Sequence, residues 1–203
     1  MENKKYLIGL TGQSGAGKTT VSEVFRKNGY EVLNADLIAR NLQENGAVID
    51  ILAQEFGQQV ITNEGKLNRK VLANIVFSDE KELQKLNDIM FPLVTQVVIQ
   101  MSEKTDKDKI LLDAPQLFES GANKMCYFTI AVTAPKEILI KRIMKRDSIT
   151  EEMAKKRLSN QHTEEFFKEN ADFIINNNGS ENELKKFTQH IVNSINKIIS
   201  ENI

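Results

Sequence analysis

The stretch Gly12–Thr19 has the residue types and the spacing of a loop that binds phosphate groups. It reads Gly-Gln-Ser-Gly-Ala-Gly-Lys-Thr and matches the pattern G-x-x-x-x-G-K-[ST]. An apolar segment precedes it and a helix-compatible segment follows it, which is the setting that this motif requires. The alternative, a Gly-rich turn that arose by chance, is disfavoured because both neighbouring segments are correctly placed.

Each residue type in this loop has a use with a triphosphate. Glycines let the backbone turn sharply and direct its N–H groups inward, and the following helix adds unpaired N–H groups and the positive end of its dipole. We expect Lys18 to reach the β- and γ-phosphates, Thr19 to ligate Mg²⁺ and Thr20 to contact the α-phosphate. The loop therefore predicts binding of ATP with Mg²⁺. The predicted ATP-binding residues of the loop are Gly12, Ser14, Gly15, Ala16, Gly17, Lys18, Thr19 and Thr20.

Two aspartates end predicted strands, and ligands of open α/β sheets bind beyond the carboxyl ends of strands. Asp36 follows Val32–Ala35, where it could accept a proton from an attacking hydroxyl group or cap the helix that begins at Leu37. Asp113 follows the apolar run Ile110–Leu112 and could lie beside Mg²⁺, although any such strand can end in Asp. Both interpretations stay open for each residue.

Other charged residues are less well defined by spacing alone. Arg142 and Arg146 share one face of a predicted helix and could stabilise transferred phosphate charge, but lysines and glutamates surround them, which favours a solvated face. Glu119 could contact a substrate or could be a solvated loop carboxylate. Arg40 and Arg69 are isolated residues that spacing does not assign.

The elements that must position these residues alternate between strands and helices. The first, third and fourth predicted strands are apolar nearly throughout, which is typical of strands in a parallel sheet buried on both faces. We predict an α/β fold of the P-loop NTPase type, with a five-stranded parallel sheet and helices on both faces. The predicted strands are 6–11, 31–35, 109–114, 127–133 and 172–176.

Two helical regions extend this predicted single domain of residues 1–203. Residues 41–104 are too many for a simple crossover and are expected to form a substrate-side helical insert, in which Pro92 should kink a helix or mark its boundary. Residues 136–168 are expected to form a lid over the nucleotide. Within it, Ser148–Glu151 has the pattern of a capping box before a helix over 152–160.

Composition excludes several classes of protein. The net charge of −1 gives no basic field for nucleic acid, and no segment is long enough to cross a bilayer or to form a signal peptide. Cys126 is the one cysteine, so it cannot form an internal disulfide and is expected to be a buried structural thiol. We expect a cytoplasmic protein that binds small molecules, without nucleic-acid or membrane partners, as a monomer or weak homo-oligomer.

Several segments, taken in order, resemble the dephospho-CoA kinase family, and the resemblance runs nearly from end to end. The phosphate loop is shared with many families, whereas the other segments are more specific. They are Ala35–Arg40, Leu67–Leu72 with Ile75–Phe77, Leu112–Pro115 with Leu117–Gly121, Arg142 with Lys145–Asp147, Arg157-Leu158 with Gln161, and Ala171–Asn177 with Gly179-Ser180.

The resemblance implies transfer of the ATP γ-phosphate to the ribose 3′-hydroxyl of dephospho-CoA. It implies that Asp36 is the base, that Arg142 and Arg146 lie near ATP with Asn177 on the adenine side, and that Lys18 and Arg142 take part in catalysis. The implied acceptor-side residues are Asp36, Arg40, Arg69, Asp113 and Glu119. The sequence departs from the family pattern at Asn34, Phe91 and Asn176, where Asp, His and Asp are usual.

Three other classes remain to be weighed. Another small-molecule kinase, such as a nucleoside or nucleoside-monophosphate kinase, would differ in its acceptor. A GTPase switch would need N-K-x-D, but Asn123–Cys126 lacks the Asp, and a transporter ATPase would need glycines that 158–161 lacks. A phosphate-binding protein without transfer activity would not depend on Asp36.

Overall fold

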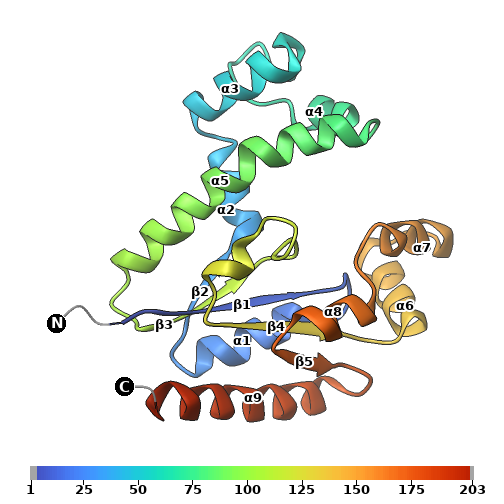
Figure 1. Cartoon of the computed structure of the whole chain (residues 1–203). Helices are drawn as coiled ribbons and strands as arrows, with labels where there is room; N and C mark the ends of the chain where they lie inside the picture. The colour runs from blue at the N-terminus through green and yellow to red at the C-terminus, as the bar shows by residue number, and fades with distance from the viewer. Residues whose placement is uncertain (1–3, 202–203) are drawn as a thin grey trace. The chain divides into compact units, whose positions relative to one another are not determined.

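The computed structural model describes residues 4–201 (Figure 1). The chain divides into two compact units. One contains the chain up to Leu33 and from Lys104 onwards, and the other is the segment Asn34–Glu103. Within the described residues, no helix has the length and apolar character needed to cross a membrane.

The first unit is built on the predicted five-stranded parallel sheet, whose order is β2-β3-β1-β4-β5. Parallel pairing places Leu10 of β1 level with both Asp113 of β3 and Ile130 of β4. Each strand matches its predicted range to within one residue. The strands are β1 (Tyr6–Gly12), β2 (Glu31–Asn34), β3 (Lys109–Asp113), β4 (Phe128–Thr133) and β5 (Phe173–Asn176).

Alternation of side chains along the strands gives the sheet two covered faces, as predicted. One face carries Ile8, Leu10 and Ile130, which belong to one buried core with residues of α1 (Lys18–Lys27) and α9 (Glu181–Glu201). On the other face, the missing Cβ of Gly9 leaves room for Leu117 and Cys126, which flank the short helix η2 (Ala122–Met125). Helix α8 (Glu164–Asn170) contacts β4 and β5, and α9 runs along the opposite side of the sheet (Figure 1).

Helices α6 (Lys136–Asp147) and α7 (Glu151–Ser159) pack against each other after β4. The predicted capping box at Ser148–Glu151 is wrong. Ser148 ends α6 with a left-handed backbone (φ 53°), and the Thr150 side chain instead accepts a hydrogen bond from the Met153 N–H at 3.3 Å. Thr150 is the N-cap because α7 starts one residue before the predicted range, which leaves Ser148 in the turn.

The second unit is helical and has a core of its own. Leu52, Phe56, Val60 and Leu72 are buried together there, with Met90 of the longest helix. The expected insert at 41–104 falls almost wholly within this unit, which begins at Asn34. Its elements are α2 (Ala35–Leu42), α3 (Gly46–Phe56), η1 (Gln58–Val60), α4 (Arg69–Val76) and α5 (Glu80–Lys104).

Pro92 does not mark a helix boundary, because α5 continues through it from Glu80 to Lys104. A proline in a helix interior removes one backbone hydrogen bond and usually disfavours the helix. Residues on either side of it, including Met90 and Leu93, pack in the core of the second unit. Tertiary packing therefore outweighs the local preference at this position.

Cys126 should be unreactive towards thiol reagents at neutral pH. Its Sγ lies 3.3 Å from the carbonyl oxygen of Ala122, and burial, with a smaller effect of the Asp172 charge, raises the pKa of the thiol to about 12. Since the thiolate is the reactive form, we expect labelling of the native protein by a maleimide at pH 7.5 to be slower by about two orders of magnitude or more than that of the unfolded protein in guanidinium. Cys126 is half-buried rather than fully buried as expected. Mass spectrometry of timed samples measures both rates, and equal rates would show that the fold does not protect this thiol.

Candidate functional site

The phosphate loop connects the end of β1 to the start of α1 and depends on glycine at two close approaches. Gly12 and Gly17 have φ of 135° and 109°, in the left-handed region that glycine tolerates. A Cβ at Gly12 would lie 2.1 Å from the carbonyl oxygen of Val132, and one at Gly17 would lie 2.7 Å from Nδ2 of Asn177. The loop therefore packs directly against the ends of β4 and β5, as its sequence pattern requires.

Lys18 is the first residue of α1, and its ammonium group folds back over the loop. Nζ donates to the carbonyl oxygen of Gly12 at 2.7 Å and lies 3.4 Å from that of Gln13. Thr19 follows on the exposed side and Thr20 is half-buried. The first N–H groups of a helix have no partner within it, so this helix start presents several donors and the positive end of its dipole together with a cation.

Asp113 lies beside α1, on the same side as Thr19. Its side chain is buried, with 8% of the residue exposed, and Oδ2 accepts a hydrogen bond from Oγ of Ser22 at 3.1 Å. Ser22 is three residues after Thr19 and therefore shares its helix face. Ser22 was not predicted as part of the site, although its spacing from Thr19 could have indicated it.

Asn177 holds the phosphate loop and α6 together from the end of β5. Its Nδ2 donates to the carbonyl oxygen of Ala16 at 2.7 Å, and its N–H donates to that of Thr133 at 2.7 Å. The Arg142 guanidinium contacts Oδ1 and the carbonyl oxygen of Asn177 at 3.4 and 3.3 Å, and the carbonyl oxygen of Gly15 at 3.5 Å. The contacts of the Asn177 side chain are thus with the loop itself, and Arg142 faces the loop.

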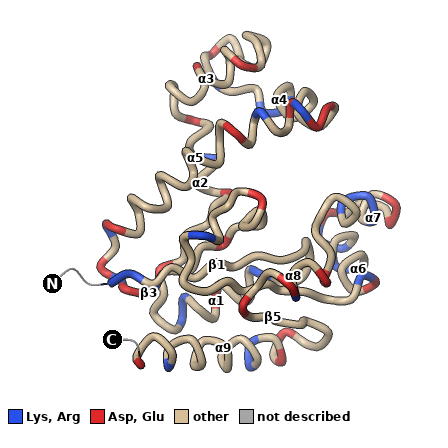
Figure 2. The backbone as a smooth tube through the Cα atoms, viewed as in Figure 1, with Lys and Arg blue, Asp and Glu red and all other residues tan. Residues whose placement is uncertain are grey.

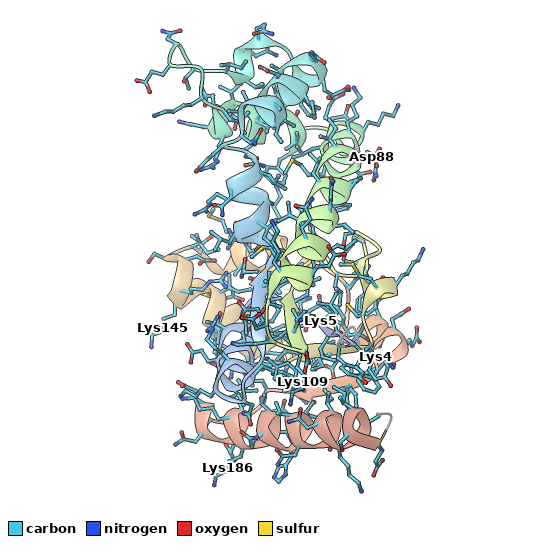
Figure 3. All side chains as sticks on the ribbon, turned by 90° about the vertical axis from the view of Figure 1, so that its left-hand side faces the viewer. Lys4, Lys5, Asp88, Lys109, Lys145 and Lys186 are labelled. Atoms are coloured by element: carbon cyan, nitrogen blue, oxygen red, sulfur yellow. The ribbon has the colours of Figure 1, made fainter. Side chains whose placement is uncertain are left out.

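Arg146 is one turn beyond Arg142 and reaches the loop from the same helix. Its Nη2 donates to Oγ of Ser14 at 3.0 Å, while Nε donates to Asp147 at 2.8 Å, and Arg157 pairs with the same carboxylate. Positive and negative side chains both occur along α6 and α7 (Figure 2), and Lys145 projects away from the molecule (Figure 3). The interpretation of this charge run as a solvated face is therefore wrong for Arg142, which is half-buried against the loop, whereas Arg146 is exposed and also contacts Ser14.

The connection between α7 and α8 also touches the loop. The Ser14 N–H donates to Oε1 of Gln161 at 2.8 Å, and Nε2 of Gln13 lies 3.4 Å from the carbonyl oxygen of His162. His162 stacks on Phe166 and its Nε2 lies 3.3 Å from Oε1 of Glu119. A cavity of about 330 Å³ lies next to these contacts and is lined in part by Gln13, Gln161 and Leu139. Glu119 thus contacts the connection between α7 and α8 rather than being an isolated loop carboxylate.

Asp36, Arg40 and Arg69 belong to the second unit. The helix-capping alternative for Asp36 is wrong, because the cap of α2 is Asn34, whose Oδ1 accepts from the Leu37 N–H at 2.8 Å. Asp36 lies exposed in the first turn of α2, where the helix dipole favours a negative charge. Nη2 of Arg69 donates to the carbonyl oxygen of Arg40 and to Oε1 of Glu44, both at 3.1 Å.

Comparison with known proteins shows to which family this site belongs. The sequence model of the family described as dephospho-CoA kinase matches residues 6–183. The dephospho-CoA kinase of Fusobacterium nucleatum is 35% identical over 189 residues, which cover 93% of this chain and 98% of that protein. This chain belongs to the dephospho-CoA kinase family.

Solved structures agree with this assignment. A crystal structure of TT1252 from Thermus thermophilus has a TM-score of 0.82 at 30% identity and covers 94% of this chain and 98% of its own. The dephospho-CoA kinase from Campylobacter jejuni has a TM-score of 0.69 at 30% identity, with 95% and 98% covered. As a kinase of the dephospho-CoA kinase family, the chain uses ATP as its co-substrate, and the match favours this family over the nucleoside kinases considered above.

The structure also shows contacts that the residue-by-residue analysis of the sequence missed. Gln161 and Asp147 were noted only as parts of a resembling segment, without a role. The structure gives each of them a contact in the site: Gln161 with the Ser14 N–H, and Asp147 with Arg146 and Arg157. Neither contact could be read from spacing, because α6, the α7–α8 connection and the loop meet only in the folded chain.

The Asp147→Asn substitution should cost stability at neutral pH and not at low pH. The hydrogen bond from Arg146 is the main reason why the pKa of Asp147 lies below its ordinary value of 3.8, with further contributions from the charges of Arg146 and Arg157. A carboxylate with a lowered pKa stabilises the folded state above the pKa of the unfolded chain, and this contribution is lost as the pH falls through the folded-state pKa.

Thermal unfolding of both proteins between pH 7 and pH 3 measures this effect. We expect a small difference in Tm at pH 7, because both arginines that pair with Asp147 are about half exposed. The difference in Tm should become progressively smaller as the pH falls below the ordinary pKa of an aspartate. Asp88→Asn, at the outward-pointing side chain of α5 (Figure 3), is the matched control. A difference that stays constant with pH would mean that Asp147 acts through packing and not through its charge.

Proposed function

We propose that this chain transfers the γ-phosphoryl group of ATP to the ribose 3′-hydroxyl of dephospho-CoA, which gives CoA and ADP. The observation that carries the proposal is the match of residues 6–183 to the family model, on a chain whose loop at 12–19 has the geometry of a phosphate site. The 3′-oxygen attacks the γ-phosphorus, the bond from the γ-phosphorus to the β–γ bridging oxygen breaks, and the proton of the hydroxyl passes to a base.

The ATP side of the proposed site is the phosphate loop with its lid. The loop N–H groups and the start of α1 would hold the phosphates, and Lys18 would move from the Gly12 carbonyl oxygen to the β- and γ-phosphates. Arg142 and Arg146 already contact Gly15 and Ser14, so they would meet the transferred group without a large movement. Residues 136–168 act as the lid in this proposal, and Asn177 serves the nucleotide by fixing the loop.

Thr19 and Asp113 fit the requirements of Mg²⁺. This cation prefers oxygen ligands, keeps several waters and takes few protein ligands besides the substrate phosphates. The Thr19 hydroxyl is exposed at the start of α1, and the buried Asp113 carboxylate lies on the same side of that helix, bonded to Ser22. When bound, Mg²⁺ would neutralise phosphate charge. Among the described residues no cluster of three His, Cys, Asp or Glu could hold a metal by itself, which suits an ion held largely by ATP.

The acceptor side of the proposed site consists of Asp36 with Arg40, Arg69, Asp113 and Glu119. Asp36 lies in the first turn of α2, which follows β2, and is therefore beyond the carboxyl end of a sheet strand, where open α/β sheets bind their ligands. It would orient the 3′-hydroxyl and accept its proton. The second unit would bind the rest of dephospho-CoA. We further propose a cytoplasmic enzyme that acts as a monomer or weak homo-oligomer and has no nucleic-acid partner.

A direct assay tests this function. Purified protein is incubated with ATP, MgCl₂ and dephospho-CoA, and CoA and ADP are quantified by mass spectrometry, with adenosine and AMP as rival acceptors. We expect CoA and ADP in equal amounts, and no product when EDTA exceeds Mg²⁺. Phosphate transfer to adenosine or AMP instead, or ATP consumption without any acceptor product, would refute the proposed acceptor.

A further inference from the structure

The α7–α8 connection, residues 160–163, is bound to the phosphate loop at two consecutive positions. Oε1 of Gln161 accepts the Ser14 N–H at 2.8 Å, and the carbonyl oxygen of His162 lies 3.4 Å from Nε2 of Gln13. The backbone and the first turn of α8 bring these groups to the loop, whereas the imidazole of His162 points to a different partner. The side chain of His162 is therefore free to serve a purpose other than direct contact with the loop.

The imidazole of His162 is oriented by groups on two sides. Its ring stacks on that of Phe166 in α8, with the ring centroids 3.6 Å apart and an angle of 9° between the planes. Its Nε2 lies 3.3 Å from Oε1 of Glu119, which belongs to the loop that follows β3. The neighbouring Phe118 packs edge-on against Phe166, with the centroids 5.5 Å apart. Two adjacent residues of this loop therefore hold the stacked pair of rings.

The loop that follows β3 is itself bound to the strand that leads into the phosphate loop. Oγ1 of Thr11, near the end of β1, donates to the carbonyl oxygen of Pro115 at 3.0 Å. Glu119 is thus attached to the same base as the phosphate loop. Its contact with His162 holds the α7–α8 connection at a fixed place beside that loop.

The contact between His162 and Glu119 depends on the charge of the imidazole. Histidine side chains ordinarily change charge between about pH 5 and pH 8, and only the protonated imidazole carries the positive charge that attracts a carboxylate. The pairing is therefore strongest at low pH and weakens as the pH rises and the imidazole loses its proton. Both side chains are about a third exposed, so the effect is expected to be moderate.

Other charged residues close to His162 do not compete with Glu119 for the imidazole. Those that line the same cavity are Lys136, Glu164 and Glu165. Glu164 pairs with Lys168 at 2.8 Å, and Glu165 is hydrogen-bonded at the start of its own helix. Lys136 is exposed, so that solvent and salt screen its charge. The carboxylate of Glu119 is therefore the group that responds to protonation of the imidazole.

We propose that His162 is a positioning residue for ATP, which makes the affinity for ATP depend on pH. The protonated imidazole pairs with Glu119 and holds the α7–α8 connection against the phosphate loop. Gln161 then fixes the Ser14 peptide group, and the Ser14 hydroxyl stays where it accepts from Arg146 at 3.0 Å. This inference rests on the ATP side of the proposed function and adds a pH dependence to it.

Substitutions at position 162 separate the charge from the ring. His162→Phe keeps a ring that can stack on Phe166 and removes the pairing with Glu119. Relative to wild type at the same pH, it should raise the Kd for MgATP by about threefold to fivefold at pH 6 and by less than about 1.5-fold at pH 8. His162→Gln keeps a hydrogen-bond donor and should restore part of the lost affinity at pH 6.

A double-mutant cycle identifies the partner of the imidazole. In a Glu119→Gln protein, His162→Phe should have no further effect on the Kd for MgATP at pH 6, because the pairing is already lost. His190→Phe is the matched control, since His190 is the other histidine of the chain, is exposed on α9 and does not line the cavity. Its Kd should equal that of wild type at both pH values.

Isothermal titration with MgATP, in the absence of dephospho-CoA, measures each Kd, so the result does not depend on turnover. A merely structural role of His162 would give the same ratio of Kd values at pH 6 and pH 8. That constant ratio, or an undiminished effect of His162→Phe in the Glu119→Gln protein, would refute the inference, and the proposed function would stand if wild-type protein makes CoA. If the ratio changes with pH as expected but no CoA is formed, the proposed acceptor is refuted and the role of His162 stands.

Discussion

Replacement of Lys18 by Met should lower kcat by about 10²–10³, the range found when one preorganised donor to transition-state charge is removed. Lys18 is the cation at the start of α1, and its ammonium lies 2.7 Å from the carbonyl oxygen of Gly12, within the loop that would hold the phosphates. Met keeps the length and apolar stem of the side chain and removes only the charge and its hydrogen bonds. The assay is initial-rate ADP formation at saturating ATP and dephospho-CoA.

Two further variants separate loss of charge from loss of loop structure. Lys145→Met removes an exposed lysine from α6 that points away from the loop (Figure 3), and it should leave kcat within about twofold. Lys18→Arg keeps the positive charge but replaces the compact ammonium with a planar guanidinium. This variant should fold normally, and its kcat should remain well below that of the wild-type enzyme. A Lys18→Met enzyme with wild-type kcat would show that the ammonium does not act on the transferred phosphate.

Replacement of Asp36 by Asn should lower kcat by about 10²–10⁴, the usual contribution of general acid–base catalysis, while the Kd for ATP stays unchanged. Asn cannot accept the proton of the 3′-hydroxyl, although it has nearly the same shape as Asp. The structure makes this substitution informative because Asn34, and not Asp36, caps α2. The variant should therefore keep helix α2 and its stability, so that a lower rate can be attributed to the phosphoryl-transfer step.

Single-turnover formation of CoA measures the chemical step, and titration with ATP measures nucleotide binding. Asp88→Asn, on the outward face of α5, should have wild-type rates (Figure 3). If Asp36→Asn retained more than about a third of the wild-type rate, the proton would have to leave by another route, and the assignment of Asp36 as base would be rejected. That result would also fit a protein that binds ATP for a purpose other than transfer.

The phosphate loop is contacted by more than one part of the segment 136–168, which we propose as the lid. The hydroxyl of Ser14 accepts a hydrogen bond from Arg146, and its N–H donates to Gln161, so α6 and the α7–α8 connection both contact this one loop residue. Arg142 approaches Gly15 from the same helix. Both arginines of α6 are thus directed at the loop, which in the proposed function would reduce the reorganisation needed for transfer.

Local pattern was enough to predict the sheet and the loop. The strands of a parallel sheet are apolar on both faces, so each appears as a short apolar run, and all five were found to within one residue. The glycines at 12, 15 and 17 were expected to permit the sharp turns of the phosphate loop, and all three have positive φ. In both cases the structural requirement applies to residues within one short segment, so the sequence of that segment is enough to predict the structure.

The features that the sequence did not determine depend on contacts between segments that are far apart in the chain. Spacing placed Arg142 and Arg146 on one helix face, but not on the face that meets the loop, and only the packing of α6 beside Gly15 decided this. Which of Asn34 and Asp36 caps α2 was decided by where β2 ends. Periodicity along one helix specifies a direction relative to its own axis, whereas the groups that lie in that direction are set by the tertiary fold.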